Sequence, residues 1–169
     1  MIIFAACKNN HQLPAIDVAG HIKGDLRKLD SIPYSLLKIT EKNSGQPDSV
    51  YIKKADLWKL IAPFLSDEIK QENLSDHYTE TSFADATIQS VMITYQAKEK
   101  DHQINQVAVY VNPENGRINR IYINGFFDDN NWKGKKQLMW AEQKGLTIIS
   151  TKEDDQSGTE TITEKIIWQ

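Results

Sequence analysis

The sequence has a single cysteine, Cys7, and no long apolar run in its 169 residues. One cysteine leaves no partner for a disulfide within the chain and no second thiolate for a metal cluster. No stretch approaches the roughly 18 to 20 apolar residues of a membrane-spanning helix. The net charge of -3 gives no basic face of the kind that nucleic acids require. We therefore expect no nucleic-acid partner.

Cys7 stands at the end of a pattern typical of bacterial lipoprotein signals. An apolar residue and two small ones, Phe4-Ala5-Ala6, precede it, and small residues leave the backbone unhindered for the peptidase that cuts before the lipidated cysteine. A signal peptide also needs a basic start and an apolar core of about 7 to 15 residues. Only six residues precede Cys7, and none is Lys or Arg. Either the true start lies upstream, or the match is accidental and Cys7 is an ordinary thiol.

We expect the first alternative, because the polar run that follows Cys7 cannot cover a thiol. On this interpretation residues 1–6 are the remnant of a signal peptide, Cys7 carries lipid chains such as palmitate, and residues 7–15 form a polar tether. The lipid is then the contact with the membrane. Lys8, in place of an aspartate after the cysteine, favours the outer membrane, with the domain facing the periplasm of the cell envelope.

Residues 16–169 have the composition of one globular domain. The whole chain is 40% hydrophobic and 25% charged, which is ordinary for a protein with a substantial core. A stripe of apolar residues at helical spacing predicts a first helix over 16–29, and a second helix begins near Lys54. Pro63 is expected to end the regular part of that helix near Ala62. Between the two helices, 34–41 and 49–53 predict a hairpin.

The second half of the chain changes to strand-length runs separated by turns. We expect strands over 87–97, 104–111, 117–126, 135–141, 146–152 and 160–168. The preceding polar stretch, 66–86, predicts a partly helical crossing. The clearest turn is Asn112-Pro113-Glu114-Asn115-Gly116, in which proline fixes one turn residue and glycine tolerates a positive φ.

These elements predict an α+β fold. The simplest packing is a twisted antiparallel sheet of about six to eight strands, able to curl into a half-barrel, with two helices from the N-terminal half on one face.

Four segments carry a resemblance to a family. They are Asp25-Leu26-Arg27-Lys28-Leu29, Asp48-Ser49-Val50-Tyr51-Ile52, the helix with Trp58 and Ala62-Pro63-Phe64-Leu65, and Ile93-Thr94-Tyr95. Together they resemble a group of small uncharacterised lipoproteins of Gram-negative bacteria. That resemblance implies an envelope location and no particular activity. Separately, the hairpin from Val107 to Ile123 is similar to the strand pair of PepSY-type domains, which implies an inhibitory or regulatory module as one alternative.

Catalytic and metal sites find little support in the residues. The four histidines lie far apart, and none has a second ligand three or four positions away; a zinc or catalytic histidine needs converging partners. We expect no metal site and no cofactor, and we assign no catalytic residue. An alternative function is a periplasmic hydrolase whose site is assembled from distant residues such as Asp76, His77 and Glu80.

A set of aromatic residues is the candidate binding surface. If they share one face of the sheet, they offer a platform for a small apolar ligand or for an envelope protein, although large aromatic side chains more often fill a core. The set consists of Tyr95, Tyr110, Tyr122, Trp140 and Trp168. The leading hypothesis is thus a lipid-anchored, non-enzymatic binding or interaction module.

Overall fold

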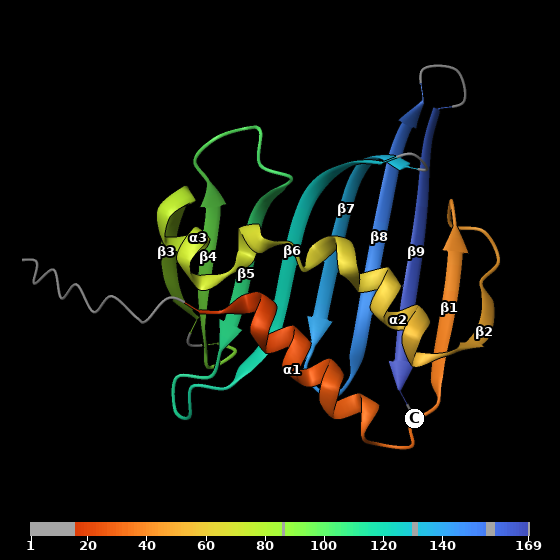
Figure 1. The fold of residues 1–169 in the computed structure, drawn as a ribbon, viewed down its shortest axis with the longest axis horizontal. Helices are drawn as coiled ribbons and strands as arrows, with labels where there is room; N and C mark the ends of the chain where they lie inside the picture. Colours follow the sequence, from red (N-terminus) through yellow and green to blue (C-terminus); the bar gives the residue numbers. More distant parts are fainter. Residues whose placement is uncertain (1–15, 86, 130–131, 155–157, 169) are drawn as a thin grey trace, which may run out of the picture.

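The computed structural model describes residues 16–85, 87–129, 132–154 and 158–168. Within these ranges the chain forms three α-helices and nine β-strands (Figure 1). Two short 3-10 turns, Ala62–Phe64 and Asp67–Ile69, follow the second helix. The helices are α1 (Val18–Asp30), α2 (Lys54–Ile61) and α3 (Gln71–His77). The strands are β1 (Leu36–Lys42), β2 (Asp48–Ile52), β3 (Tyr78–Asp85), β4 (Ser90–Ala97), β5 (Ile104–Val111), β6 (Ile118–Asp129), β7 (Trp132–Ala141), β8 (Gly145–Asp154) and β9 (Gly158–Trp168).

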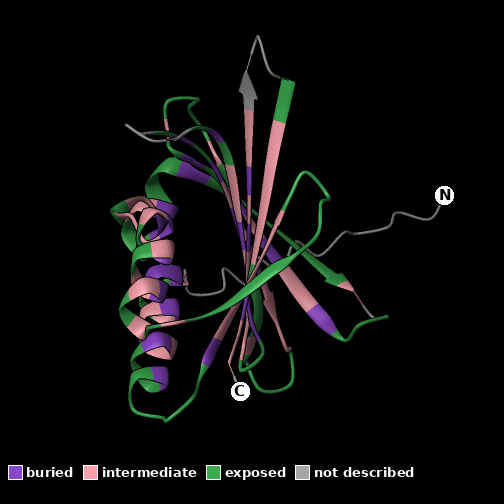
Figure 2. Cartoon of the chain, turned by 90° about the vertical axis from the view of Figure 1, so that its right-hand side faces the viewer, coloured by how far each residue is buried: buried purple, intermediate pink, exposed green. Residues whose placement is uncertain are grey.

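All described strands join one open antiparallel sheet. The order across the sheet is β2-β1-β9-β8-β7-β6-β5-β4-β3, so β2 and β3 are its edges. Strands β3 to β9 form a meander, and β9 then pairs with β1, with Leu36 opposite Trp168. In the view of Figure 2 the strands fan out at changing angles, which is the accumulated twist of the sheet. The α+β class and the antiparallel sheet are confirmed.

The predicted number of strands was too low, because β3 was missed. The polar segment 66–86 contains a turn, the short helix α3 and then β3, rather than a partly helical crossing alone. Most side chains of β3 are exposed, since an edge strand has one neighbour only and here lies beyond the long helices. The alternation of apolar and polar residues that marks a half-buried strand is therefore absent from its sequence.

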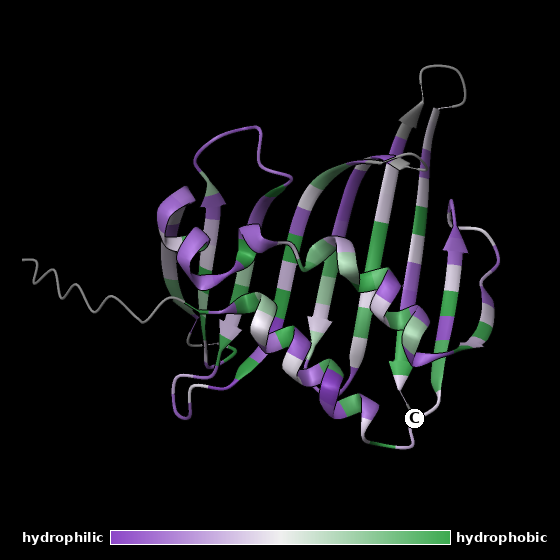
Figure 3. Ribbon diagram, in the orientation of Figure 1, coloured by the Kyte–Doolittle hydropathy of each residue, from purple (hydrophilic) through white to green (hydrophobic). Residues whose placement is uncertain are grey.

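Helices α1 and α2 cover one face of the sheet (Figures 1 and 2). The apolar stripe of α1 is buried as predicted, and it packs with the inward residues of the strands to form one core. Hydrophobic and hydrophilic residues alternate along the strands (Figure 3), which is the pattern of a sheet with one covered face. Of the predicted stripe, Ala19, Ile22, Leu26 and Leu29 are buried, whereas Ile16 lies before the helix and is partly buried; Val18 is buried beside them.

Contacts at both ends fix the position of α1. Asp17 caps the first turn, where its Oδ1 accepts a hydrogen bond of 2.9 Å from Gly20 N. At the other end the ammonium group of Lys54, the first residue of α2, donates to three backbone carbonyls. These belong to Leu29, Asp30 and Ile32, at 2.6, 2.9 and 2.7 Å. The last carbonyls of a helix have no partner within it, so Lys54 ties the start of α2 to the end of α1.

Two of the predicted local features are confirmed. Regular helix α2 ends at Ile61, and Pro63 lies in the 3-10 turn that follows. The hairpin of β5 and β6 turns at Gly116, whose φ is +69°, a conformation that glycine adopts at little steric cost. Asn112 Oδ1 accepts a hydrogen bond of 2.8 Å from Glu114 N and so closes the turn.

Candidate functional site

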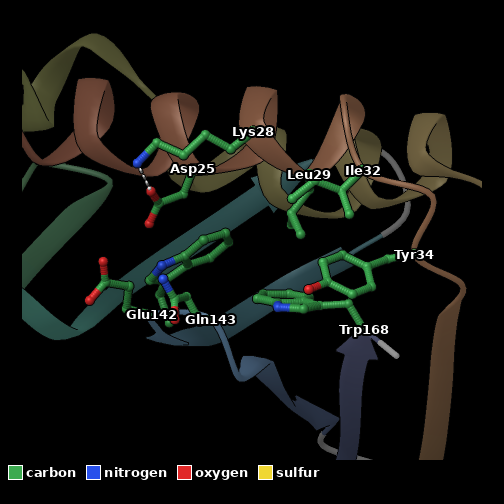
Figure 4. Close-up of a pocket in the computed structure, with 9 residues that line it drawn as sticks. Asp25, Lys28, Leu29, Ile32, Tyr34, Glu142, Gln143 and Trp168 are labelled. Carbon is green, nitrogen blue, oxygen red and sulfur yellow. Dashed lines mark hydrogen bonds and ion pairs between the residues drawn. The ribbon is translucent and has the colours of Figure 1, made fainter.

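A cavity of about 340 Å³ lies between the second half of α1 and the sheet. Its volume is at the small end of ligand pockets, which span roughly 300 to 1,000 Å³. The segment that joins α1 to β1 closes one side, and the ends of β7 and β9 form the floor (Figure 4). We call it the tryptophan pocket. Its lining residues are Asp25, Lys28, Leu29, Ile32, Tyr34, Trp140, Glu142, Gln143 and Trp168.

Two indole rings form the apolar floor of the pocket. Trp140 lies opposite Leu146, and Leu146 lies opposite Ile166, so all three share the face covered by the helices. Trp168 follows Ile166 by two positions and therefore points to the same face. The ring centroids of Trp140 and Trp168 are 5.6 Å apart at an interplanar angle of 44°. Leu29, Ile32 and Tyr34 complete the apolar wall.

Trp140 brings an unpaired polar atom to this floor. The residue is only 1% exposed, and among the described residues its Nε1–H has no hydrogen-bond partner. A buried donor without a partner destabilises a fold by about 1 to 3 kcal/mol. Such a group in a cavity is a natural point for a ligand to bind.

Asp25 brings an acceptor to the same cavity. Its side chain is 12% exposed, and Oδ1 pairs with Lys28 Nζ at 3.0 Å. Its other oxygen, Oδ2, is buried and makes no hydrogen bond within the described part of the chain. His21 Nε2 lies 3.6 Å from Oδ2, which is beyond good hydrogen-bond length. The pocket therefore contains one unpaired donor and one unpaired acceptor.

The remaining polar lining lies at the mouth of the pocket. Glu142 Oε2 pairs with Arg117 Nη2 at 3.1 Å, and Figure 4 shows the Glu142 carboxylate across the opening from Asp25. The pocket thus combines aromatic and aliphatic walls with a few charged groups, the usual make-up of a small-molecule site.

The predicted aromatic set is divided between the two faces of the sheet. Trp140 and Trp168 share the tryptophan pocket, and Tyr95 lies on the same face but in the core, 1% exposed. Burial raises the pKa of Tyr95 to about 12, and its hydroxyl accepts a long hydrogen bond of 3.5 Å from Ile16 N. The five candidate aromatic residues therefore do not form a single surface.

The two other tyrosines form a separate pair on the uncovered face. Tyr95 lies opposite Val107, and Tyr110 is an odd number of positions after Val107, so its side chain points the other way. The rings of Tyr110 and Tyr122 meet edge to face, with centroids 5.5 Å apart. Because Val107 and Val109 are buried, the alternation along β5 places Tyr110 on the uncovered face, away from the tryptophans.

A row of side-chain amides also crosses the uncovered face. Asn124 Nδ2 donates to Gln106 Oε1 at 2.8 Å, and Gln137 Nε2 donates to Asn124 Oδ1 at 2.7 Å. These bonds connect β5, β6 and β7, and they satisfy the amides with one another. We therefore interpret the row as structural.

The residues of the alternative hydrolase site do not converge. Asp76, His77 and Glu80 are all exposed, and no ion pair or hydrogen bond joins their side chains in the described ranges. The ring of His77 lies instead beside that of His102, with centroids 5.5 Å apart. Among the described residues no group of three or more His, Cys, Asp or Glu side chains is placed to hold a metal ion.

Cys7, the predicted signal-peptide remnant 1–6 and the predicted tether 7–15 all lie outside the described residues. In the part of the chain that the structure covers, no helix has the length and apolar character to cross a membrane. No family model, curated protein or solved structure matches this chain.

Asp25 and Glu142 are site residues that sequence reasoning missed. Asp25 is one of several charged residues on α1, and Glu142 follows the last residue of β7. One signal was present, because Asp25 lies one turn before Leu29 on the edge of the apolar stripe. A carboxylate at that edge is placed beside whatever the helix covers.

Proposed function

We propose that this protein is a non-enzymatic binding module of the bacterial cell envelope, held at the membrane by lipid on Cys7. Its tryptophan pocket binds a small, largely apolar ligand. The observation that carries the proposal is Trp140, a buried indole that lines a cavity and whose Nε1–H has no partner among the described residues.

The walls of the pocket support an apolar ligand. Five of the nine lining residues are aromatic or aliphatic, and paired aromatic contacts are worth about 0.5 to 1.5 kcal/mol beyond the area that they bury. A six-membered ring presents flat apolar faces to such walls. The other four lining residues are polar or charged, and such groups fix the orientation of a bound ligand.

Binding can be tested with small probes on the full chain. Toluene and phenol are titrated into 15N-labelled protein, and the indole Nε1–H resonances are followed by NMR. We expect saturable shifts of the Trp140 resonance. Trp168→Ala removes one wall and should weaken binding of both probes roughly tenfold. Tyr122→Ala, on the opposite face, is the matched control and should leave binding unchanged. Absence of saturable shifts with either probe refutes ligand binding in the pocket.

The anchor is tested separately by expression from the natural upstream region in a Gram-negative host. The wild-type protein should enter the detergent phase, whereas Cys7→Ser should remain in the aqueous phase, because acyl chains supply about 0.8 kcal/mol per buried methylene. Mass spectrometry of the first peptide gives the modification directly. Wild-type protein found wholly in the soluble fraction with an unmodified Cys7 overturns the anchor without affecting the pocket.

A further inference from the structure

The two unpaired atoms in the tryptophan pocket have opposite hydrogen-bonding character. Trp140 Nε1–H is a donor only, and the carboxylate oxygen Asp25 Oδ2 is an acceptor only. Both residues line the same cavity. A ligand group that satisfies both must accept one hydrogen bond and donate another. This requirement narrows the chemistry of the ligand considerably.

We infer that the ligand carries a hydroxyl group on a six-membered ring, an inference that rests on the proposed binding function of the pocket. A hydroxyl supplies one donor and two acceptor lone pairs. Its oxygen accepts from Trp140 Nε1–H, and its proton is donated to Asp25 Oδ2. The ring lies against Trp168 and the apolar wall.

Ammonium, ether and ketone groups each satisfy only one of the two atoms. An ammonium group donates to Asp25 but offers no lone pair to the Trp140 N–H. An ether or ketone accepts from the N–H but has no proton for the carboxylate. His21 does not remove the need for a donor, because its Nε2 lies 3.6 Å from Asp25 Oδ2 and is itself without a hydrogen bond among the described residues.

The burial of the two atoms makes the hydroxyl decisive. Both are closed off from solvent and lack a hydrogen bond among the described residues. A hydroxyl that reaches them supplies both bonds, whereas a methyl group at the same position leaves a buried donor and a buried acceptor unpaired. The polar corner of the pocket thus selects between ligands of nearly equal shape.

A ring that carries a hydroxyl group can belong to a phenol or to a sugar. The C–H faces of a sugar also pack on indole rings. Four probes of graded chemistry test the inference on the full chain: phenol accepts and donates, anisole only accepts, toluene does neither, and methyl β-glucoside presents hydroxyls on a saturated ring. The dissociation constants come from the NMR titration of the Trp140 resonance, assigned by its loss in Trp140→Phe.

Phenol should bind about tenfold to a hundredfold more tightly than toluene, with anisole between them, since each unpaired buried group costs about one factor of ten. Phenol should also move the Trp140 N–H resonance downfield, as a new hydrogen bond does. Glucoside binding at the same resonance assigns the hydroxyl to a sugar, and binding of phenol alone assigns it to a phenol. Either result supports a ligand that carries a hydroxyl group.

Two variants locate the effect. In Trp140→Phe and in Asp25→Asn, the preference for phenol over toluene, taken as the ratio of the two dissociation constants within each variant, should fall severalfold or more. Because Trp140→Phe has no indole resonance at this site, its titrations are followed by Trp168. Tyr122→Phe on the uncovered face is the matched control, and far-UV circular dichroism confirms that each variant is folded.

The outcomes separate this inference from the proposed function. Equal affinity for phenol and toluene overturns the hydroxyl while the binding function stands. An unchanged phenol preference in both variants overturns the assignment to Trp140 and Asp25. Failure of all four probes refutes the proposed function itself.

Discussion

The three carbonyls held by Lys54 give the sharpest test of how the helices are fixed. In Lys54→Met the apolar stem of the side chain is retained and only the ammonium group is lost. The carbonyls of Leu29, Asp30 and Ile32 then lose contacts of 2.6 to 2.9 Å to a positive charge. They lie at the C-terminal end of α1, where the helix dipole also favours a cation.

The expected loss follows from these contacts. A hydrogen bond to a charged group contributes about 1.5 to 3 kcal/mol, and the helix dipole adds about 0.3 to 1 kcal/mol. The carbonyls sit close to the surface, so water replaces part of what is lost, and the three bonds share one donor. We therefore expect the free energy of unfolding to fall by about 2 to 3 kcal/mol, with a fall in Tm of about 5 to 10 °C for a chain of this size.

Urea unfolding followed by circular dichroism measures the change. The m-value should stay constant, which shows that the same surface is exposed on unfolding. The control is Lys59→Met on the same helix, whose side chain is 80% exposed and lies 3.6 Å from Asp56. Exposed pairs of this kind contribute little, so its effect should stay within about 0.5 kcal/mol. A Lys54→Met protein as stable as the Lys59→Met control refutes the reasoning.

The same substitution should weaken binding in the tryptophan pocket. Ile32 and Tyr34 line the pocket from the segment that follows α1, and Lys54 holds the carbonyl of Ile32. Without that contact the segment is less well fixed, and binding must first order it. Phenol should therefore bind more weakly to Lys54→Met than to Lys59→Met in the NMR titration.

Three further predictions concern stability. Gly145→Ala should lower the free energy of unfolding by about 3 kcal/mol, because the φ of Gly145 is +138° and a Cβ would lie 2.3 Å from the Ile166 carbonyl oxygen. Gly24→Ala should instead raise it by about 0.5 to 1 kcal/mol, because a Cβ there meets no atom within 4 Å. Urea unfolding that gives both variants the same stability contradicts this prediction. Glu68→Ala should lower the free energy of unfolding by about 1 to 3 kcal/mol. The reason is that the Glu68 carboxylate accepts hydrogen bonds from Ile104 N at 2.8 Å and from Gln103 N at 3.3 Å at the start of β5. An unchanged unfolding midpoint in urea would show that water replaces the carboxylate at these amides. Burial raises the pKa of Tyr95 to about 12, above the value of about 10 in the unfolded chain. The folded state therefore holds the phenolic proton more tightly than the unfolded state. The free energy of unfolding should fall as the pH rises from about 10 to about 12. Urea unfolding at each pH should show wild type losing on the order of 2 kcal/mol relative to Tyr95→Phe across that window, and a constant difference would count against the argument.

Local periodicity predicted much of the fold. The stripe from Ile16 to Leu29 gave α1 within two residues of its observed start and one of its end, because a helix that covers a sheet must be apolar on one side. Pro63 marked the end of α2 for an equally local reason. Strand β3 was not predicted, because its residues from Thr79 to Ala84 are exposed at the edge of the sheet. The sequence there lacks the alternation of apolar and polar residues that indicates a strand.

The tryptophan pocket was only partly predictable. Trp140 and Trp168 were among the candidate residues, but nothing in their own neighbourhood says that Asp25 lies beside them. That contact depends on where α1 crosses the sheet, which is set by packing between distant segments. The place of Tyr110 on the other face was predictable, because it stands between Val109 and Val111 in an alternating strand.

The pairing of β9 with β1 has a consequence for how the molecule is made. Among the described strands, the hairpin of β1 and β2 adjoins the rest of the sheet only through β9, which is made after the other eight, with Leu36 facing Trp168. Contacts between such distant segments form late and slowly, so β1 must wait, unpaired on one side, until β9 has been synthesised. Tyr34 and Trp168 meet at this same junction, and a bound ligand there stabilises only chains that have closed it. Occupancy of the pocket would thus report that the protein has finished folding.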